Sequence, residues 1–195
     1  MNLYLYKFSY KTDKIPDVSF IPMILRRRLD DFGKITLATM HEIYENQKNI
    51  NLVFASNCGD FDRVLKLIEQ KNTEGEISPV GFSFSVHNSI VGLFSLINGI
   101  NSSYNSVSAG ENTLAAGILE SLIQNGETLF CYGESVGGYK SAACIFSNEE
   151  KEGAVKLEME EGQKNKIGTF EEFIEFLQKE RESFVSEFFT LKRAE

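Results

Sequence analysis

Apolar and polar positions repeat with two different periods along the chain, and the changes of period predict the order of the elements. Residues 3–10 alternate as expected for a strand, and the short apolar run at 51–55 is typical of a buried strand. Further strands are predicted at 104–108, 128–132, 140–146 and 154–160. The last two read as a pair joined by an acidic turn. Strands that alternate with helical segments predict an α/β layered fold, in a single domain over residues 1–195.

Helical spacing of apolar residues marks the remaining segments. Helices are predicted at 22–46, from about Asp60 to a polar surface loop at 71–80, at 88–98, at 111–124 and at 169–189. Pro22 is placed to open the first helix, and Gly33 marks a break or kink in it. Thr169 with Glu172 three residues later forms a capping-box pattern. The helix at 88–98 carries hardly any charge, so we expect it to be buried on nearly all sides.

Charge and cysteine content narrow the class of protein. The net charge of −8 disfavours binding to a phosphate backbone. The cluster Arg26–Arg28 is either a solvated helix face or a patch for an acidic carrier protein. Three widely spaced cysteines form neither a disulfide framework nor a zinc site, which favours a reducing cytoplasm. Neither a signal peptide nor an apolar run of ~18 residues is present, so no transmembrane segment is expected.

Two short patterns suggest a nucleophile, and each has a plainer explanation. Gly133–Gly137 matches the Gly-x-Ser-x-Gly elbow around Ser135 and follows a strand. An α/β-hydrolase needs a later histidine, however, whereas His41 and His87 both precede Ser135. Cys58 and His87 are candidates for a Cys–His dyad, since a thiolate needs a nearby base. A free cysteine is also among the residues most often buried, where it behaves as a small apolar group, and His87 then caps or packs at the start of its helix.

Known nucleotide and metal motifs are missing from the sequence. Neither Gly-x-Gly-x-x-Gly nor Gly-x-x-x-x-Gly-Lys-Ser/Thr occurs, and two histidines without a second ligand cluster do not suggest a metal. We therefore expect no cofactor and no bound metal.

Four segments resemble a known family. They are Leu25–Leu29, Phe54–Asn57, Ser83–Gly92 (SFSVHNSIVG) and Gly110–Gly117 (GENTLAAG). The resemblance covers roughly residues 20–160 and is to the β-ketoacyl synthase-like N-terminal domain found in aryl polyene gene clusters. It implies a thiolase-like layered fold that corresponds mainly to the N-terminal half of a β-ketoacyl synthase.

The resemblance also implies that the catalytic position is degenerate. A working synthase carries a nucleophilic cysteine where this sequence has Ser108 or Ala109, followed by Gly110 and Glu111. The two histidines of a synthase belong to its second half, which this sequence does not match. The resemblance is therefore to chain-length factors, which pair with a full-length ketosynthase and shape its acyl tunnel. Residues expected to line that tunnel or its interface are His87, Asn88, Tyr104, Ser106 and Ser108.

Several functions remain open at this point. The first is a non-catalytic subunit of polyketide or fatty-acid-type biosynthesis in a heterodimer, with possible binding of an acyl carrier protein. The second is a small acyltransferase or thioesterase that uses Cys58 or Ser135. The third is a homodimeric binding module. Because the sequence resembles half of a synthase, the helix at 88–98 is expected to lack its usual cover and to leave an apolar surface for a partner.

Overall fold

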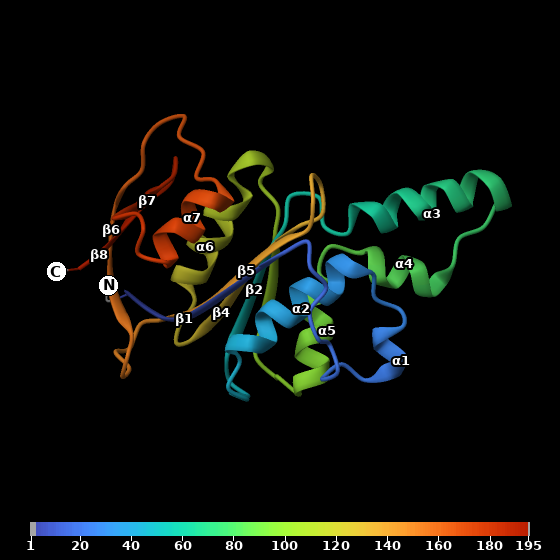
Figure 1. Ribbon diagram of the computed structural model, residues 1–195, viewed down its shortest axis with the longest axis horizontal. Helices are drawn as coiled ribbons and strands as arrows, with labels where there is room; N and C mark the ends of the chain where they lie inside the picture. Colours follow the sequence, from blue (N-terminus) through green and yellow to red (C-terminus); the bar gives the residue numbers. More distant parts are fainter. Residues whose placement is uncertain (1–2, 195) are drawn as a thin grey trace.

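One mixed sheet of eight strands runs through the molecule, which is described here by a computed structural model of residues 3–194 (Figure 1). The order across the sheet is β3-β2-β4-β5-β1-β6-β8-β7. The strands are β1 (Leu3–Thr12), β2 (Asn51–Ala55), β3 (Tyr104–Val107), β4 (Thr128–Glu134), β5 (Lys140–Ser147), β6 (Val155–Glu161), β7 (Ser183–Val185) and β8 (Phe189–Arg193). β2 pairs in parallel with both β3 and β4, and the other pairings are antiparallel.

Helices cover both faces of this sheet. They are α1 (Met23–Arg26), α2 (Asp31–Ile43), α3 (Phe61–Glu74), α4 (Pro79–Ser85), α5 (Ser89–Asn98), α6 (Thr113–Ile123) and α7 (Phe170–Leu177), with a short 3-10 turn at Gly110–Asn112 before α6. α2 and α5 enclose one apolar core, and α6 and α7 enclose the other on the opposite face (Figure 1). The α/β layered fold predicted from the sequence is confirmed.

Capping side chains explain where the helices begin. Asp30, Asp60, Ser78 and Thr169 each accept a hydrogen bond from a backbone N–H in the first turn of the helix that follows. Such N-caps satisfy donors that have no partner inside the helix. At Thr169 the predicted capping box is present, because the Glu172 side chain also accepts from the Thr169 N–H.

Some predicted boundaries are wrong. The first helical segment breaks at residues 27–30, before Gly33, because Asp30 caps a new helix there. The predicted loop at 71–80 is half helical: α3 continues to Glu74, and α4 begins at Pro79. The last predicted helix ends at Leu177 and is followed by the hairpin of β7 and β8.

The predicted pairing of the strands near 140–146 and 154–160 is also wrong. Both strands exist as β5 and β6, but β1 lies between them and pairs with each. The sequence shows the acidic turn that connects β5 to β6, yet it contains no local sign that a distant strand separates them.

Helix α5 is less buried than its composition predicts, whereas α6 is enclosed. Ile90, Val91 and Phe94 of α5 are buried against the sheet, whereas Leu96 is 72% exposed, so α5 is not buried on all sides. On the other face, α7 and the β7–β8 hairpin enclose α6 with a cluster of aromatic side chains. The C-terminal third of the chain therefore supplies a cover for α6.

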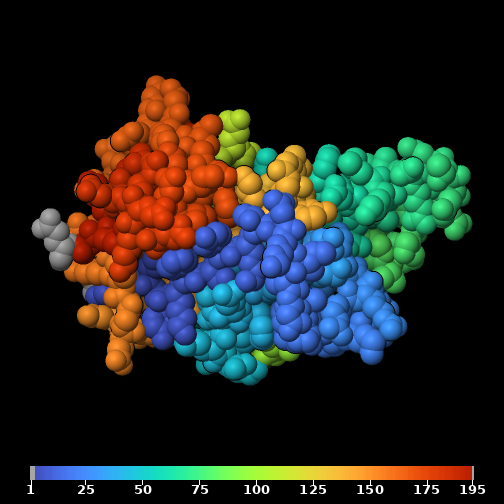
Figure 2. Space-filling view, in the orientation of Figure 1, coloured from blue at the N-terminus to red at the C-terminus, as the bar shows by residue number. Residues whose placement is uncertain are grey.

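Helices α3 and α4 form a hairpin (residues 61–85) that projects beyond the rest of the molecule (Figures 1 and 2). Neither helix has a buried residue. Large apolar side chains are exposed on it, namely Phe61, Leu65, Ile68, Ile77, Val80 and Phe82. Among residues 3–194, no single helix is long and apolar enough to cross a membrane; α4 and α5 pass such a test only together, and they meet at a 94° bend.

Candidate functional site

The carboxyl ends of the parallel strands β3, β2 and β4 lie side by side at one end of the strands. Functional groups of α/β proteins gather at the carboxyl ends of such strands. The segments that leave it are 56–60, 108–112 and 134–138, and the turn at 86–88 before α5 lies beside them. Most of the side chains proposed from the sequence lie here, and their hydrogen bonds show what each one does.

Ser108 and its neighbours form a tightly bonded turn at the start of α6. The Ser108 hydroxyl donates to the Asn57 carbonyl oxygen at 3.1 Å. The Ala109 N–H donates to Thr113 Oγ1 at 2.9 Å, and that hydroxyl donates to the Gly110 carbonyl oxygen at 2.6 Å. Gly110 has a φ of +59°, which favours glycine. Within residues 3–194, neither an imidazole nor a carboxylate hydrogen-bonds the Ser108 hydroxyl, so nothing activates it.

His87 is half-buried and binds the loop that follows β2. Its Nε2–H donates to the Ser56 carbonyl oxygen at 2.7 Å, and its ring lies 5.8 Å from that of Phe54. Asn88 occupies the N-cap position of α5 but makes no capping hydrogen bond through its side chain, which is exposed. His87 therefore joins the α5 turn to the β2 loop, as expected of a packed histidine.

Cys58 is exposed in the loop that follows β2, at the carboxyl ends of the parallel strands, and is not hydrogen-bonded to His87. Partial burial, followed by the negative charge of Glu134, raises the pKa of the Cys58 thiol above its ordinary value. The thiol is therefore protonated at neutral pH, the opposite of what a nucleophilic cysteine needs. Both observations speak against the dyad, but Cys58 is not the buried apolar cysteine of the plainer interpretation either, because it is exposed.

Ser135 is buried and bonded on both sides. Its hydroxyl donates to the Gly59 carbonyl oxygen at 2.8 Å and accepts from the Phe61 N–H at 3.2 Å. After Gly137 and Gly138 the chain enters β5 rather than a helix, so the elbow geometry is absent at this point. Ser135 holds the end of β4 to the start of α3.

Tyr104 and Ser106 lie on β3, at the edge of the sheet. The carbonyl oxygens of Ser103 and Val107 accept from β2. Because residues alternate in a parallel ladder, the backbone N–H and C=O groups of Tyr104 and Ser106 face away from β2. The Tyr104 side chain lies over Gly92 of α5 and is 42% exposed. β3 thus offers free backbone groups beside an apolar helix.

The sequence of this chain matches the model of a known protein family. The model of the family described as β-ketoacyl synthase, N-terminal domain, matches residues 6–129, more than half of the chain. The chain belongs to this family.

Solved structures share the β-ketoacyl synthase fold with this chain. One is a chain of the complex of the ketosynthase ApeO with its chain length factor ApeC from Xenorhabdus doucetiae, with 15% identity, a TM-score of 0.75 and all of both chains covered. Another is the ishigamide ketosynthase/chain length factor, with 11% identity and a TM-score of 0.59 over 82% of this chain and 67% of the other. A third is from the AntDE:AntF complex of a type II acyl carrier protein with its ketosynthase, with 12% identity and a TM-score of 0.59 over 75% and 62%. No curated protein sequence matches significantly.

Two further residues contribute to the site, although no sequence motif pointed to either of them. Thr113 holds the turn at the start of α6. Glu134 accepts from the Asn57 N–H at 3.0 Å and adds the negative charge near Cys58. Glu134 lies inside the Gly-x-Ser-x-Gly pattern, where the motif assigns no role to the residue before the serine. Within residues 3–194, no group of three metal-binding side chains comes together.

Proposed function

We propose that this chain is a non-catalytic, chain-length-factor-like subunit that pairs with an active ketosynthase in polyketide or aryl polyene assembly. The single observation that carries the proposal is the turn at Ser108–Glu111. Where a synthase of this family needs an ionisable nucleophile, the chain has a serine hydroxyl bonded to a carbonyl oxygen, then an alanine. An unactivated serine is a poor acyl acceptor, and alanine does not react.

The fold neighbours agree with a paired subunit. Two of them come from complexes named for a ketosynthase and a chain length factor, and a third includes an acyl carrier protein. By analogy, the partner of this chain is a ketosynthase with an intact active site. A carrier protein is a second candidate partner, and its acidic surface suits the exposed side chains of Arg27 and Arg28.

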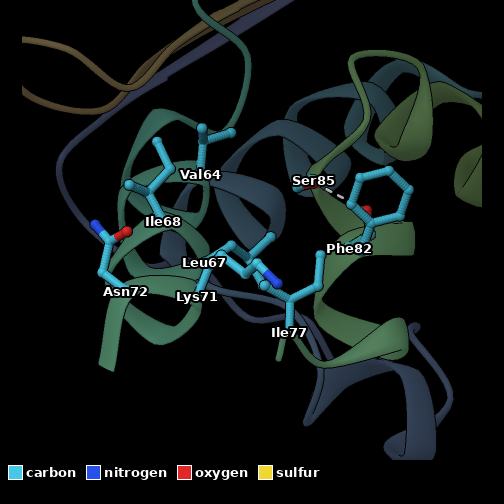
Figure 3. A pocket seen from close by; sticks show the side chains of 8 residues that line it. All are labelled: Val64, Leu67, Ile68, Lys71, Asn72, Ile77, Phe82 and Ser85. Carbon is cyan, nitrogen blue, oxygen red and sulfur yellow. Dashed lines mark hydrogen bonds between the residues drawn. The ribbon is translucent and has the colours of Figure 1, made fainter. Parts of the chain in front are cut away.

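The free edge of β3 is the surface proposed for the ketosynthase. Its unpaired backbone groups at Tyr104 and Ser106 are able to pair with a strand of another chain. Four residues are few beside the roughly 20–30 residues that each side of a stable interface contributes. The α3–α4 hairpin offers a separate apolar surface: a groove of about 400 Å³ lies between its helices, with Leu67, Ile77 and Phe82 in its lining (Figure 3).

A pair of variants at Ser106 tests the proposal. Proline at this position removes an N–H that faces the free edge, whereas the β2 ladder keeps its hydrogen bonds. Ser106→Ala removes only the side-chain hydroxyl and serves as the matched control. Co-expressed with a candidate ketosynthase, the wild type and Ser106→Ala are expected to co-elute with it, and Ser106→Pro is expected to elute alone with an unchanged circular dichroism spectrum.

Two results would decide against this function. A wild-type chain that forms a tight self-dimer and never co-elutes with a ketosynthase would favour the homodimeric module. Stoichiometric acylation of the isolated chain by an acyl thioester, found by intact mass, would restore the acyltransferase alternative through Cys58 or Ser135.

A further inference from the structure

Two aspartates and an arginine join the base of the α3–α4 hairpin to α2. Asp30 caps α2 by accepting from the Gly33 N–H at 3.0 Å, and Asp60 caps α3 by accepting from the Arg63 N–H at 3.2 Å. The two carboxyl groups are close enough to hydrogen-bond each other. Asp60 ends the segment 56–60 of the candidate site, but the side chains of this aspartate–arginine cluster (Asp30, Asp60 and Arg63) make none of the site hydrogen bonds described above.

A single guanidinium serves both carboxyl groups. Arg63 Nε donates to Asp60 Oδ2 at 2.7 Å, and Arg63 Nη2 donates to Asp30 Oδ2 at 3.1 Å and to the Arg28 carbonyl oxygen at 3.1 Å. The side chains of Asp60, Arg63 and Asp30 are only 6%, 16% and 20% exposed. With both carboxyl groups ionised, the cluster carries a net charge of −1 in a poorly hydrated place, which is unfavourable.

Few other charges face the cluster. Lys66 of α3 acts on Asp30, and together with Arg28 it lines the outer side. Asp62 is engaged by the hydroxyl of Tyr139 at 3.0 Å. From α4 and α5 the neighbouring side chains are uncharged: Phe84, Ser89, Ile90 and Leu93. The Phe84 ring lies 5.7 Å from the Arg63 guanidinium carbon, so this side provides no further hydrogen bond to a carboxylate.

These surroundings give the two aspartates different pKa values. Burial, then the hydrogen bond with Asp30 and its charge, raises the pKa of Asp60 to about 7. Burial opposes ionisation of Asp30 too, but the hydrogen bonds from Asp60 and the Gly33 N–H and the charge of Arg63 hold the pKa of Asp30 below its ordinary value. At mildly acidic pH, Asp60 thus keeps its proton, and its carboxyl O–H donates a hydrogen bond to the ionised Asp30.

We propose that the aspartate–arginine cluster holds the α3–α4 hairpin against α2 in a protonation-dependent manner. When the hairpin separates from α2, Asp60 becomes hydrated and its pKa returns to the ordinary value of about 4. Between about pH 4 and pH 7 the attached state retains a proton that the detached state releases. Rising pH therefore favours detachment by up to about tenfold per pH unit, and the dependence levels off above about pH 7.

Hydrogen exchange of the α3 amides, measured from pH 5 to pH 8 and corrected for the intrinsic exchange rate, tests this proposal. The opening constant of α3 relative to that of α2 is expected to rise between pH 5 and pH 7 and then to level off. Asp60→Asn keeps an N-cap of equal quality but does not ionise, so its opening constant is expected to be independent of pH. Asp31→Asn is the matched control: it removes a half-exposed carboxylate paired with Lys34 and keeps the wild-type dependence.

A carboxyl titration followed by ¹³C NMR gives an independent readout. One aspartate of the wild type is expected to titrate near pH 7, and that transition is expected to be absent in Asp60→Asn. The proposal is overturned if every carboxyl group titrates below about pH 5, or if Asp60→Asn keeps the pH dependence of α3 exchange. Equal pH dependence of α2 and α3 would also overturn it, since that would mean global rather than local opening.

Discussion

Replacing Gly117 by alanine should destabilise the protein, although the same change usually stabilises a helix. Gly117 lies in α6 at a place where the helix packs closely against the sheet. A Cβ there would overlap the Ala55 side chain and lie 2.7 Å from Cε2 of Phe130. Both neighbours are fully buried, and Phe130 packs against Phe146 and Phe173, so it has little space to move.

The sizes of two opposing effects decide whether Gly117→Ala stabilises or destabilises the protein. Alanine is more favourable than glycine in a helix by about 1 kcal/mol. Overpacking a close-packed core costs about 1–3 kcal/mol, and the overlap with two immobile neighbours places Gly117→Ala at the upper end of this range. We therefore expect the free energy of unfolding to fall by about 1–2 kcal/mol.

Gly92 in α5 provides the matched control. A Cβ at this position would lie 3.5 Å from the Tyr104 hydroxyl oxygen, which is ordinary contact. Gly92→Ala should thus benefit from the higher helix propensity of alanine without overpacking, and raise the free energy of unfolding by about 0.5–1 kcal/mol. Urea denaturation followed by circular dichroism measures both variants. The packing argument fails if Gly117→Ala is as stable as the wild type, or if the two variants shift in the same direction.

Three further predictions follow from single side chains. Because its pKa is raised, Cys58 should react slowly with iodoacetamide at pH 7 and faster as the pH rises, while the buried Cys131 and Cys144 should react only after unfolding, as mass spectrometry can show. Thr169→Ala removes the capping box of α7 and should lower the free energy of unfolding by about 1 kcal/mol in urea titrations. Ser135→Ala leaves the Gly59 and Phe61 backbone groups without their partner and should cost about 1–3 kcal/mol in the same titration.

Each of these has a clear contrary result. Rapid labelling of Cys58 at pH 7 would mean an activated thiolate. A Thr169→Ala variant with unchanged stability would show that α7 is held by its apolar face alone. Stoichiometric reaction of the wild type with a fluorophosphonate, lost in Ser135→Ala, would indicate a nucleophilic rather than a structural serine.

Local signals in the sequence were sufficient for much of the fold. The apolar run at 51–55 coincides with β2, and the Thr169–Glu172 pattern marks the start of α7. Both rest on interactions within a few residues or on burial of a continuous apolar segment. The plainer interpretations of Ser135 and His87 also agree with their hydrogen bonds to backbone carbonyl groups.

Long-range pairing and projecting segments were not predictable in this way. β1 separates β5 from β6, and a hydrophobic pattern does not reveal which strands become neighbours. Phe184 follows Leu177 at the seven-residue spacing of a helix, which is why the predicted helix was too long. In the structure Phe184 and Phe189 fill the core from two short strands instead. No helix was predicted at 79–85, where α4 lies, because a helix of seven residues gives little periodicity. The roles of Ser108–Glu111 at the degenerate position stay predictions.

The central place of β1 has a consequence for biosynthesis. This strand is synthesised well before its two neighbours, β5 and β6, which begin only at Lys140 and Val155. Until then both of its edges are open to pairing with other strands, which invites aggregation. A premature stop before β6 would therefore leave one edge of β1 permanently unpaired, and folding that waits for such long-range pairing is expected to be slow.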